Sequence, residues 1–304
     1  MKIRFILILL LLIIVPECSI YAADKSEIWD PITPGPFTTF TAPVVEKNKF
    51  VLQPLYFFNI GRGAFDGEGG YNSLPGKDYK YHQVIQLYTQ YGLADRTEIN
   101  CQPSWDMHNI RQGGNSAEAA GFGDFLMNAR YCGIDESAWC PRVTGLFQVK
   151  LPTGKYQNAD PDKLGGDIIG TGSTDYTYGL SFTKGAYPIR TLFHLDLLLT
   201  NAPSPVRIDG VKTGFSDTYI VNGAFEWIFY KKMNLMGELL WQTQGDKKLD
   251  GNWTADTSKS SLILSMGIGY SEKDWQMLVG YQRTLLGENV DANDTIAGTV
   301  IINF

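Results

Sequence analysis

Through most of its 304 residues, the chain alternates hydrophobic and polar side chains in about twelve short segments. Successive side chains of a β-strand point to opposite faces, so each segment is predicted to be a strand with one apolar and one polar face. In the last segment, Ile296 and Val300 share one face, whereas Thr295 and Thr299 share the other. The predicted strands are 50–59, 81–92, 96–108, 122–134, 138–151, 173–183, 187–200, 216–230, 232–245, 260–271, 273–284 and 294–304.

The connections between these segments alternate in length. The short ones are Leu93-Ala94-Asp95, Asp135-Glu136-Ser137, Gly185-Ala186, Lys231-Lys232 and Glu272-Lys273. The long ones are rich in Gly, Asn and Asp and cover 60–80, 109–121, 152–172, 201–215, 245–259 and 286–293. Short periplasmic turns and long outer loops are typical of bacterial outer-membrane barrels with an even strand number. We therefore predict an all-β fold, a transmembrane antiparallel up-and-down β-barrel of about twelve strands with both termini in the periplasm.

The composition leaves two kinds of β protein to choose between. Hydrophobic residues make up 44% of the chain and aromatic residues 13%. After residue 23, no stretch approaches the roughly 18 apolar residues of a membrane helix. In the predicted register, Trp139, Trp227 and Trp275 lie on the apolar face near short turns, and Trp105 and Trp241 lie near long loops. Two such belts are expected at the two membrane interfaces, whereas a soluble sandwich would bury the same aromatics in its core.

The C-terminus tests whether the sheet closes. The chain stops in mid-strand at Phe304, and an unpaired strand edge invites aggregation. In a closed barrel, 294–304 pairs with both 273–284 and 50–59, and pairing on one side only would contradict the prediction. A terminal Phe also resembles the C-terminal signature of outer-membrane barrels, through which the barrel-assembly machinery is expected to bind.

The N-terminus has the layout of a secretory signal peptide. Lys2 and Arg4 precede an apolar run, and the small residues Ala22 and Ala23 predict cleavage after residue 23. An uncleaved anchor is the alternative, although the run is short for one. The division is then a signal peptide at 1–23, an N-terminal periplasmic segment or plug at 24–47, and the barrel at 48–304. For 24–47, a mobile tail is slightly favoured over a plug in the periplasmic mouth.

Several short glycine-rich motifs carry a family resemblance. They are Tyr91-Gly92-Leu93-Ala94-Asp95-Arg96, Phe122-Gly123-Asp124, Leu151-Pro152-Thr153-Gly154-Lys155-Tyr156 and Gly170-Thr171-Gly172-Ser173-Thr174-Asp175-Tyr176. Together they resemble the family of outer-membrane transporters named for the meta pathway of phenol degradation, over most of the mature chain. The resemblance implies passage of aromatic or similar small molecules and brings no catalytic residues with it.

Three cysteines follow the predicted cleavage site. Cys132 and Cys140 flank the turn around Glu136 symmetrically, so they are candidates for a disulfide between paired strands in an oxidising periplasm, with two free thiols as the alternative. Cys101 falls on the apolar face and is expected to be unpaired. No metal site is expected, because the chain has no Cys-x-x-Cys motif or spaced His cluster.

The three histidines, His82, His108 and His194, are the only candidates for base chemistry near neutral pH. An outer-membrane hydrolase with a Ser-His pair would carry them toward lipid. In the predicted register, His194 points inward with Asp196, so we expect no enzyme and no cofactor. The net charge of −6 also makes the chain a poor binder of nucleic acid.

The polar faces supply the candidate functional residues. The inward-pointing candidates are Glu98, Asp106, Asp124, Arg130, Arg142, Lys150, Asp175, Arg190, His194, Asp196, Glu226 and Glu238. A barrel of twelve strands lies between small, filled barrels and large, open pores. The charges therefore either line a channel for passive uptake of small molecules, aromatic or hydrophobic ones included, or cross-link a filled lumen in a structural or surface-interaction protein. The expected partners are outer-membrane lipid and a small-molecule solute.

Overall fold

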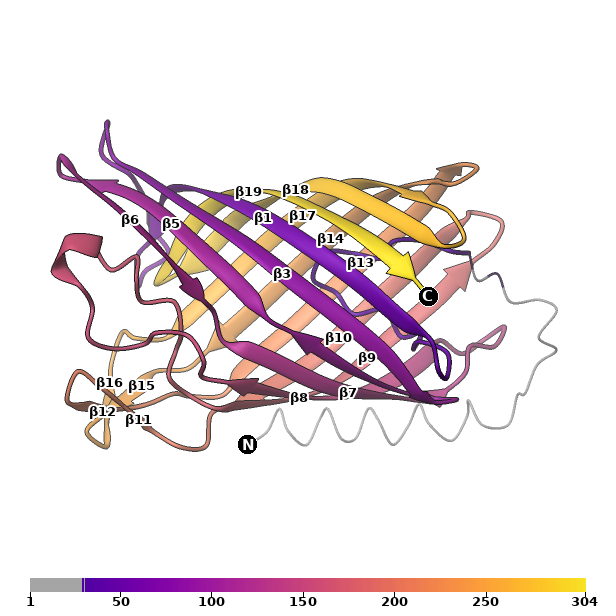
Figure 1. Ribbon diagram of the computed structural model, residues 1–304, viewed down its shortest axis with the longest axis horizontal. Coiled ribbons are helices and arrows are strands. Elements are labelled where there is room, and N and C mark those ends of the chain that lie inside the picture. Colours follow the sequence, from indigo (N-terminus) through magenta and orange to yellow (C-terminus); the bar gives the residue numbers. More distant parts are fainter. Residues whose placement is uncertain (1–28, 30) are drawn as a thin grey trace.

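The chain folds into a closed antiparallel barrel of twelve strands (Figure 1). The computed structural model describes residue 29 and residues 31–304. The barrel strands are β1 (Phe50–Phe65), β3 (Tyr79–Ala94), β4 (Thr97–Gln102) with β5 (Ser104–Gln112), β6 (Asn115–Phe122) with β7 (Phe125–Ile134), β8 (Arg142–Leu151), β9 (Asp175–Ala186), β10 (Thr191–Asn201), β13 (Thr218–Tyr230), β14 (Met233–Gln244), β17 (Lys259–Ser271), β18 (Trp275–Glu288) and β19 (Val290–Asn303). The predicted signal peptide lies outside the described residues.

The last strand closes the barrel as predicted. β19 pairs with β18 on one side and with β1 on the other, so the sheet has no open edge between its first and last barrel strands. At the periplasmic end, the backbone N–H of Phe304 donates to the carbonyl of Phe50 at 2.9 Å, and the two rings lie 6.0 Å apart. The short turns gather at this end, on the right of Figure 1, and the longer loops gather at the other.

The two faces of the wall separate as the alternation predicts. In β13, Asn222 and Glu226 are buried toward the lumen, whereas Phe225 and Trp227 are exposed on the outside. Trp227, Trp275, Trp105 and Trp241 are exposed on barrel strands, as predicted for aromatic belts facing the membrane interfaces, whereas Trp139 is exposed in the turn between β7 and β8 and not on a strand. The outer face is therefore the lipid-facing one, and the inner face carries the polar residues.

Two strands are interrupted where the sequence breaks the ladder. Pro103 separates β4 from β5, because proline has no N–H to donate to a neighbouring strand. Gly123 and Asp124 separate β6 from β7. The expected loop at 109–121 is wrong: β5 and β6 form a hairpin joined by Gly113 and Gly114, whose φ angles of 59° and 88° suit a tight turn.

Other boundaries also shift. The expected loop at 286–293 is instead a tight connection at Asn289 between β18 and β19. The expected short turn at 185–186 moves to residues 187–190, and the turn after β7 lengthens to residues 135–141. The remaining outer loops are long and hold β2 (Tyr71–Ser73) and a small sheet of β11 (Val206–Ile208), β12 (Val211–Gly214), β15 (Lys247–Leu249) and β16 (Asn252–Thr254).

The loop after β8 carries the short 3-10 helix η2 (Pro161–Lys163). None of the helical residues in the described part of the chain forms a helix with the length and apolarity needed to cross a membrane.

Candidate functional site

The N-terminal segment 31–47 runs inside the barrel rather than away from it (Figure 1). Pro34, Phe37, Thr39 and Ala42 are buried in this segment. The segment has no regular secondary structure, so its backbone groups need partners other than one another. Lumen side chains provide those partners.

Glu238 and Asp196 accept hydrogen bonds from the backbone of the segment. One Glu238 oxygen accepts from the backbone N–H of Thr39 at 2.5 Å and from that of Thr38 at 3.1 Å. The Thr39 hydroxyl donates to the same oxygen. Asp196 accepts from the N–H of Phe40 at 2.6 Å. Each carboxylate is buried in the wall, so these N–H and O–H groups take the place of water at its accepting oxygen.

Glu226 connects the segment to a polar group on three strands. It accepts from the Thr33 hydroxyl at 2.9 Å and from the Asn234 amide at 2.6 Å. The His194 Nε2 atom lies 3.1 Å from Glu226 Oε1, and its Nδ1 atom lies 3.0 Å from the Thr183 hydroxyl. Both ring nitrogens of His194 are therefore engaged inside the lumen.

Glu98 and Arg130 form a buried ion pair beneath the end of the segment. Their closest N–O distance is 2.7 Å, and both side chains are at most 4% exposed. Glu98 also accepts from the N–H of Val45 at 2.6 Å, whereas Arg130 donates to the carbonyl of Thr41. The guanidinium lies over the Phe40 ring, 5.6 Å from its centroid. The pair therefore contacts three groups of the segment: the N–H of Val45, the carbonyl of Thr41 and the ring of Phe40.

A small apolar cluster lies inside the polar lumen. Phe37 packs with Met236, Leu278 and Ala297, and its ring meets Phe57 edge to face at 6.5 Å. Period-two alternation did not predict apolar residues such as Met236 and Leu278 on the inner face. They are explained by the segment, which brings Phe37 against them and removes their surface from water.

Wall glycines make room for the segment. A Cβ atom added to Gly269 would lie 2.6 Å from Pro34, and one added to Gly280 would lie 2.7 Å from Phe37. At Gly92, an added Cβ would meet the Glu46 carbonyl at 1.9 Å. Side chains at these positions would occupy the space that the segment fills.

A cavity of about 450 Å³ remains between the segment and a wall formed by β1, β3, β4, β7, β18 and β19. Amide side chains line it, namely Gln53, Gln86, Gln90, Gln102, Gln276 and Asn303. Aromatic side chains also line it, namely Phe37, Phe40, Phe57 and Tyr88. The cavity thus combines uncharged hydrogen-bonding groups with ring faces, and Arg130 is the charged side chain on its lining.

The outer half of the lumen is narrowed by the loop 152–174. Asp124 accepts from the N–H of Gly154 and from that of Thr171, both at 3.1 Å, and so ties the two ends of the loop together. Lys150 lies 2.6 Å from Asp175 and 3.5 Å from Asp124. Lys150 therefore bridges two carboxylates, and the group of three keeps one net negative charge.

Within the same loop, Lys155 pairs with Asp167 in a more exposed position. The hydrogen bond from Lys155 lowers the pKa of the Asp167 carboxyl below its ordinary value of 3.8. Desolvation opposes this change but is the smaller effect.

The predicted inward-facing residues thus fall into separate groups. Glu98, Arg130, His194, Asp196, Glu226 and Glu238 surround the segment, and Asp124, Lys150 and Asp175 hold the outer loop. Asp106 pairs with His82, and Arg142 begins β8 as a half-buried residue. Arg190 is the exception: it lies in the turn before β10, not in a strand, because that turn occupies 187–190.

The predicted disulfide between Cys132 and Cys140 is wrong, because Cys132 is a free thiol. The cross-strand partner of Cys132 is Thr144, since the longer turn moves Cys140 out of the strand ladder. Cys101 is free, as expected.

Sequence reasoning missed several functional candidates. Thr183 and Thr144 bind the N–H and the carbonyl of Ala42, yet nothing marks them as different from other strand threonines. His82 and His108 were assigned no shared role, and no metal site was expected. The structure places them directly opposite each other on β3 and β5, beside Asp106. The alternation of polar and apolar residues in the two strands could have shown that both rings lie on the polar face, but it does not give the register that pairs them.

Comparisons with known proteins agree with this architecture. The family model described as "Putative MetA-pathway of phenol degradation" matches residues 74–299. The COG4313 outer membrane channel of Pseudomonas putida F1 has a similar structure, with a TM-score of 0.70 and 15% sequence identity over 89% of this chain and 99% of that one. The β domain of the Bordetella autotransporter BrkA gives a TM-score of 0.50 and 8% identity over 85% and 100%. None of the curated proteins matches the chain in sequence. The closed barrel and its lipid-facing surface place the chain in the outer membrane of a Gram-negative bacterium.

Proposed function

Because the chain belongs to the MetA-pathway of phenol degradation family, we propose that it is an outer-membrane channel for passive uptake of small aromatic molecules. The observation that carries the proposal is the cavity beside the N-terminal segment. Its lining offers ring faces from Phe37 and Phe57 together with amides from Gln86 and Gln276. An aromatic solute with a polar substituent could stack on the rings while an amide binds the substituent.

Uncharged amides suit a passive path. A Gln side chain both donates and accepts, so it can replace the water around a hydroxyl or a carboxylate without binding either tightly. Conduction requires a site that a solute enters readily and leaves readily. Arg130 adds a positive charge to the cavity wall, but Glu98 neutralises it.

In this proposal, residues 31–47 form the plug that narrows the path. Support comes from the hydrogen bonds to Glu98, Asp196, Glu226 and Glu238 and from the apolar contact at Phe37. A plug held on one side of the lumen and leaving a cavity on the other would act as a size filter. Solutes would pass between the segment and the wall.

The proposed function involves no catalysis. His194 is engaged through both ring nitrogens by Thr183 and Glu226, so neither is available to activate a nucleophile. The Phe304 side chain is exposed at the periplasmic rim beside Phe50, where the barrel-assembly machinery is expected to engage it.

A structural or surface-interaction role is the second candidate. The extent to which the segment and the loop 152–174 fill the lumen favours it. A filled barrel would conduct neither ions nor solutes and would act through its outer loops alone.

Reconstituted protein separates the two candidates. Liposome swelling with benzoate and with cyclohexanecarboxylate compares an aromatic and a non-aromatic solute of the same charge and similar size, after subtraction of protein-free leakage. The channel proposal expects flux of both solutes, with benzoate faster, and expects Phe57→Leu to reduce the difference. Absence of both flux and single-channel conductance would exclude the channel. Conductance that appears only after deletion of 31–44 would show that the plug closes the path completely.

A further inference from the structure

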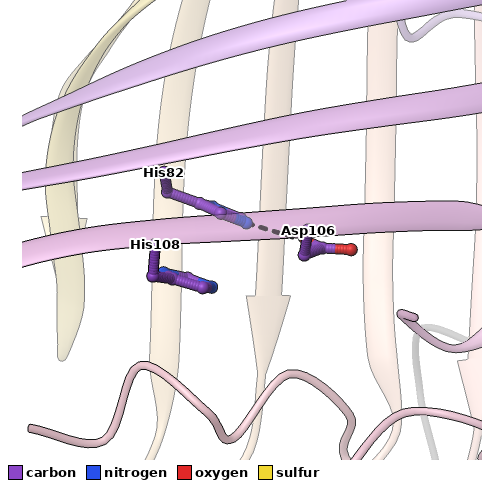
Figure 2. A group of neighbouring side chains, drawn as sticks. All are labelled: His82, Asp106 and His108. Atoms are coloured by element: carbon purple, nitrogen blue, oxygen red, sulfur yellow. Dashed lines mark hydrogen bonds and ion pairs between the residues drawn. The ribbon is translucent and has the colours of Figure 1, made fainter. Parts of the chain in front are cut away.

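Two histidines and an aspartate meet on the lumen face of β3 and β5 (Figure 2). His82 and His108 are cross-strand partners, and their rings stack at 4.1 Å with an angle of 6° between their planes. The Nε2 atom of His82 lies 2.8 Å from Asp106 Oδ1. One ligand atom from each of the three residues lies within 4.8 Å of the others.

The three side chains are held by the sheet. His82 and His108 face each other in register, and Asp106 precedes His108 by two positions, so that it projects from the same face. The second Asp106 oxygen accepts from the Ser104 hydroxyl at 3.0 Å, which fixes the carboxylate. The Nδ1 atom of His108 is buried and has no hydrogen-bond partner among the described residues. A buried ring nitrogen without a partner is a donor atom free to bind a cation.

The loop 152–174 covers this cluster. A Cβ atom added to Gly166 would lie 3.2 Å from the Cβ of His108, so the loop backbone passes close to the base of this side chain. Lys163 holds the loop there by donating to the carbonyl of Glu118 at 2.8 Å. The His82 side chain is 31% exposed, so an ion in the lumen water can still reach the cluster.

We propose that His82, Asp106 and His108 form a binding site for a divalent transition metal ion of the zinc type. Neutral imidazole suits Zn²⁺, Ni²⁺ and Cu²⁺, whereas Ca²⁺ and Mg²⁺ prefer shells made of oxygen atoms alone. Ligand bonds of about 2.0–2.2 Å require the three donor atoms to converge from their present separation. The proposal therefore requires side-chain rotations that turn the two parallel ring planes toward a common centre. Three protein ligands leave at least one position for water or a solute.

The site is independent of the proposed transport function. A bound ion would bridge β3 and β5 beneath the outer loop and place positive charge in the upper lumen. In the absence of such an ion, the cluster would be only a His82–Asp106 hydrogen bond with a stacked neighbour. Direct measurement of metal binding distinguishes these two descriptions whether or not the barrel conducts.

The test uses the full chain, folded in detergent, and Zn²⁺ as the titrant in calorimetry. The wild-type protein is expected to bind one equivalent. His82→Ala and His108→Ala are each expected to weaken binding about 10-fold or more, since losing even a group that orients a ligand costs that much. His194→Gln is the matched control, because it removes the remaining histidine of the chain from a different part of the lumen.

Co²⁺ in place of Zn²⁺ gives a second readout on the unmodified protein. Visible bands of low-coordinate Co²⁺ without a thiolate charge-transfer band are expected, because the ligands are nitrogen and oxygen. No saturable Zn²⁺ binding by the wild type would overturn the proposal. So would wild-type affinity in the double variant His82→Ala/His108→Ala, or a Co²⁺ spectrum dominated by thiolate from Cys101 or Cys132. A variant that fails to fold is replaced by Asp106→Asn, which is expected to weaken binding in the same direction.

Discussion

The lumen is filled from its two ends, and the two fillings are held differently. The N-terminal segment is bound by side chains that water hardly reaches, with Glu98 and Glu226 fully buried. The outer loop is tied to the wall by Asp124, whose side chain is 10% exposed, and is held within itself by an ion pair in which the Lys155 side chain is 45% exposed. Both fillings use acidic groups as hydrogen-bond acceptors. They differ chiefly in how much water competes for those groups.

This difference has an energetic consequence. A buried carboxylate that loses its donors has no water to replace them, so the cost of breaking its contacts is large. An exposed ion pair exchanges its partner for water at little cost. We therefore expect the segment to remain in place under conditions that already release the loop.

The largest expected effect comes from Arg130→Met. This change leaves Glu98 buried without its cation and frees the Thr41 carbonyl, and removal of one partner of a buried pair costs about 3–5 kcal/mol. Lys155→Met removes an exposed partner and should cost about 0–1 kcal/mol. Denaturant unfolding in detergent micelles measures both. Equal losses in the two variants would contradict the distinction between the two fillings.

Gly269→Leu is expected to displace the segment without removing any charge. The new side chain would project toward Pro34 and also toward the Asn234 amide that binds Glu226. Single-channel conductance should rise several-fold. Gly223→Leu is the matched control on β13, because an added Cβ there meets no atom within 4 Å. Unchanged conductance in Gly269→Leu would show either that the segment does not block the path or that it adapts to the new side chain.

Much of the barrel can be predicted from the sequence, because the alternation of apolar and polar residues is set within each strand. One apolar face and one polar face repeat along each strand, so the pairing of 294–304 with both neighbours follows from counting. The wrong predictions occur where the residue types favour one local structure and strand pairing imposes another. Gly113–Gly114 lies in a polar stretch that resembles a loop but forms a tight hairpin, and Cys140 lies in a turn that is longer than its symmetry suggests.

The interior of the barrel is harder to predict from the sequence, because the segment 31–47 and the loop 152–174 that fill it are not strands. The inward direction of Glu226 and Glu238 follows from alternation, but the identity of their partners does not. The segment 31–47 has no period, and its threonines and prolines are compatible with a mobile tail. Its position follows from two contacts with the wall: Pro34 lies against Gly269, and Phe37 packs on Met236. These wall residues come together only when the barrel closes.

A smaller effect is expected from Asp124→Asn. Asp124 ties the two ends of the outer loop through the N–H groups of Gly154 and Thr171. An amide keeps one acceptor oxygen and loses the charge that faces Lys150, so the loop should loosen but remain attached. Conductance is expected to become noisier and to rise less than in Gly269→Leu. A larger rise in Asp124→Asn would make the loop, rather than the segment, the main constriction.

The smallest expected effect is the response of the outer loop to acid. Lys155 lowers the pKa of Asp167 below 3.8, so the folded loop favours the ionised carboxylate. This stabilisation is fully present above about pH 4 and is lost as the pH falls through the lowered pKa. Fluctuations of the single-channel current should therefore increase at acid pH, as the loop loosens. Lys155→Met should move the pH at which they begin to a higher value. Asp167→Asn removes the titrating group and serves as the control. If that variant keeps the same pH profile as the wild type, the response comes from other carboxylates, and the loop is held more firmly than its exposed contacts imply.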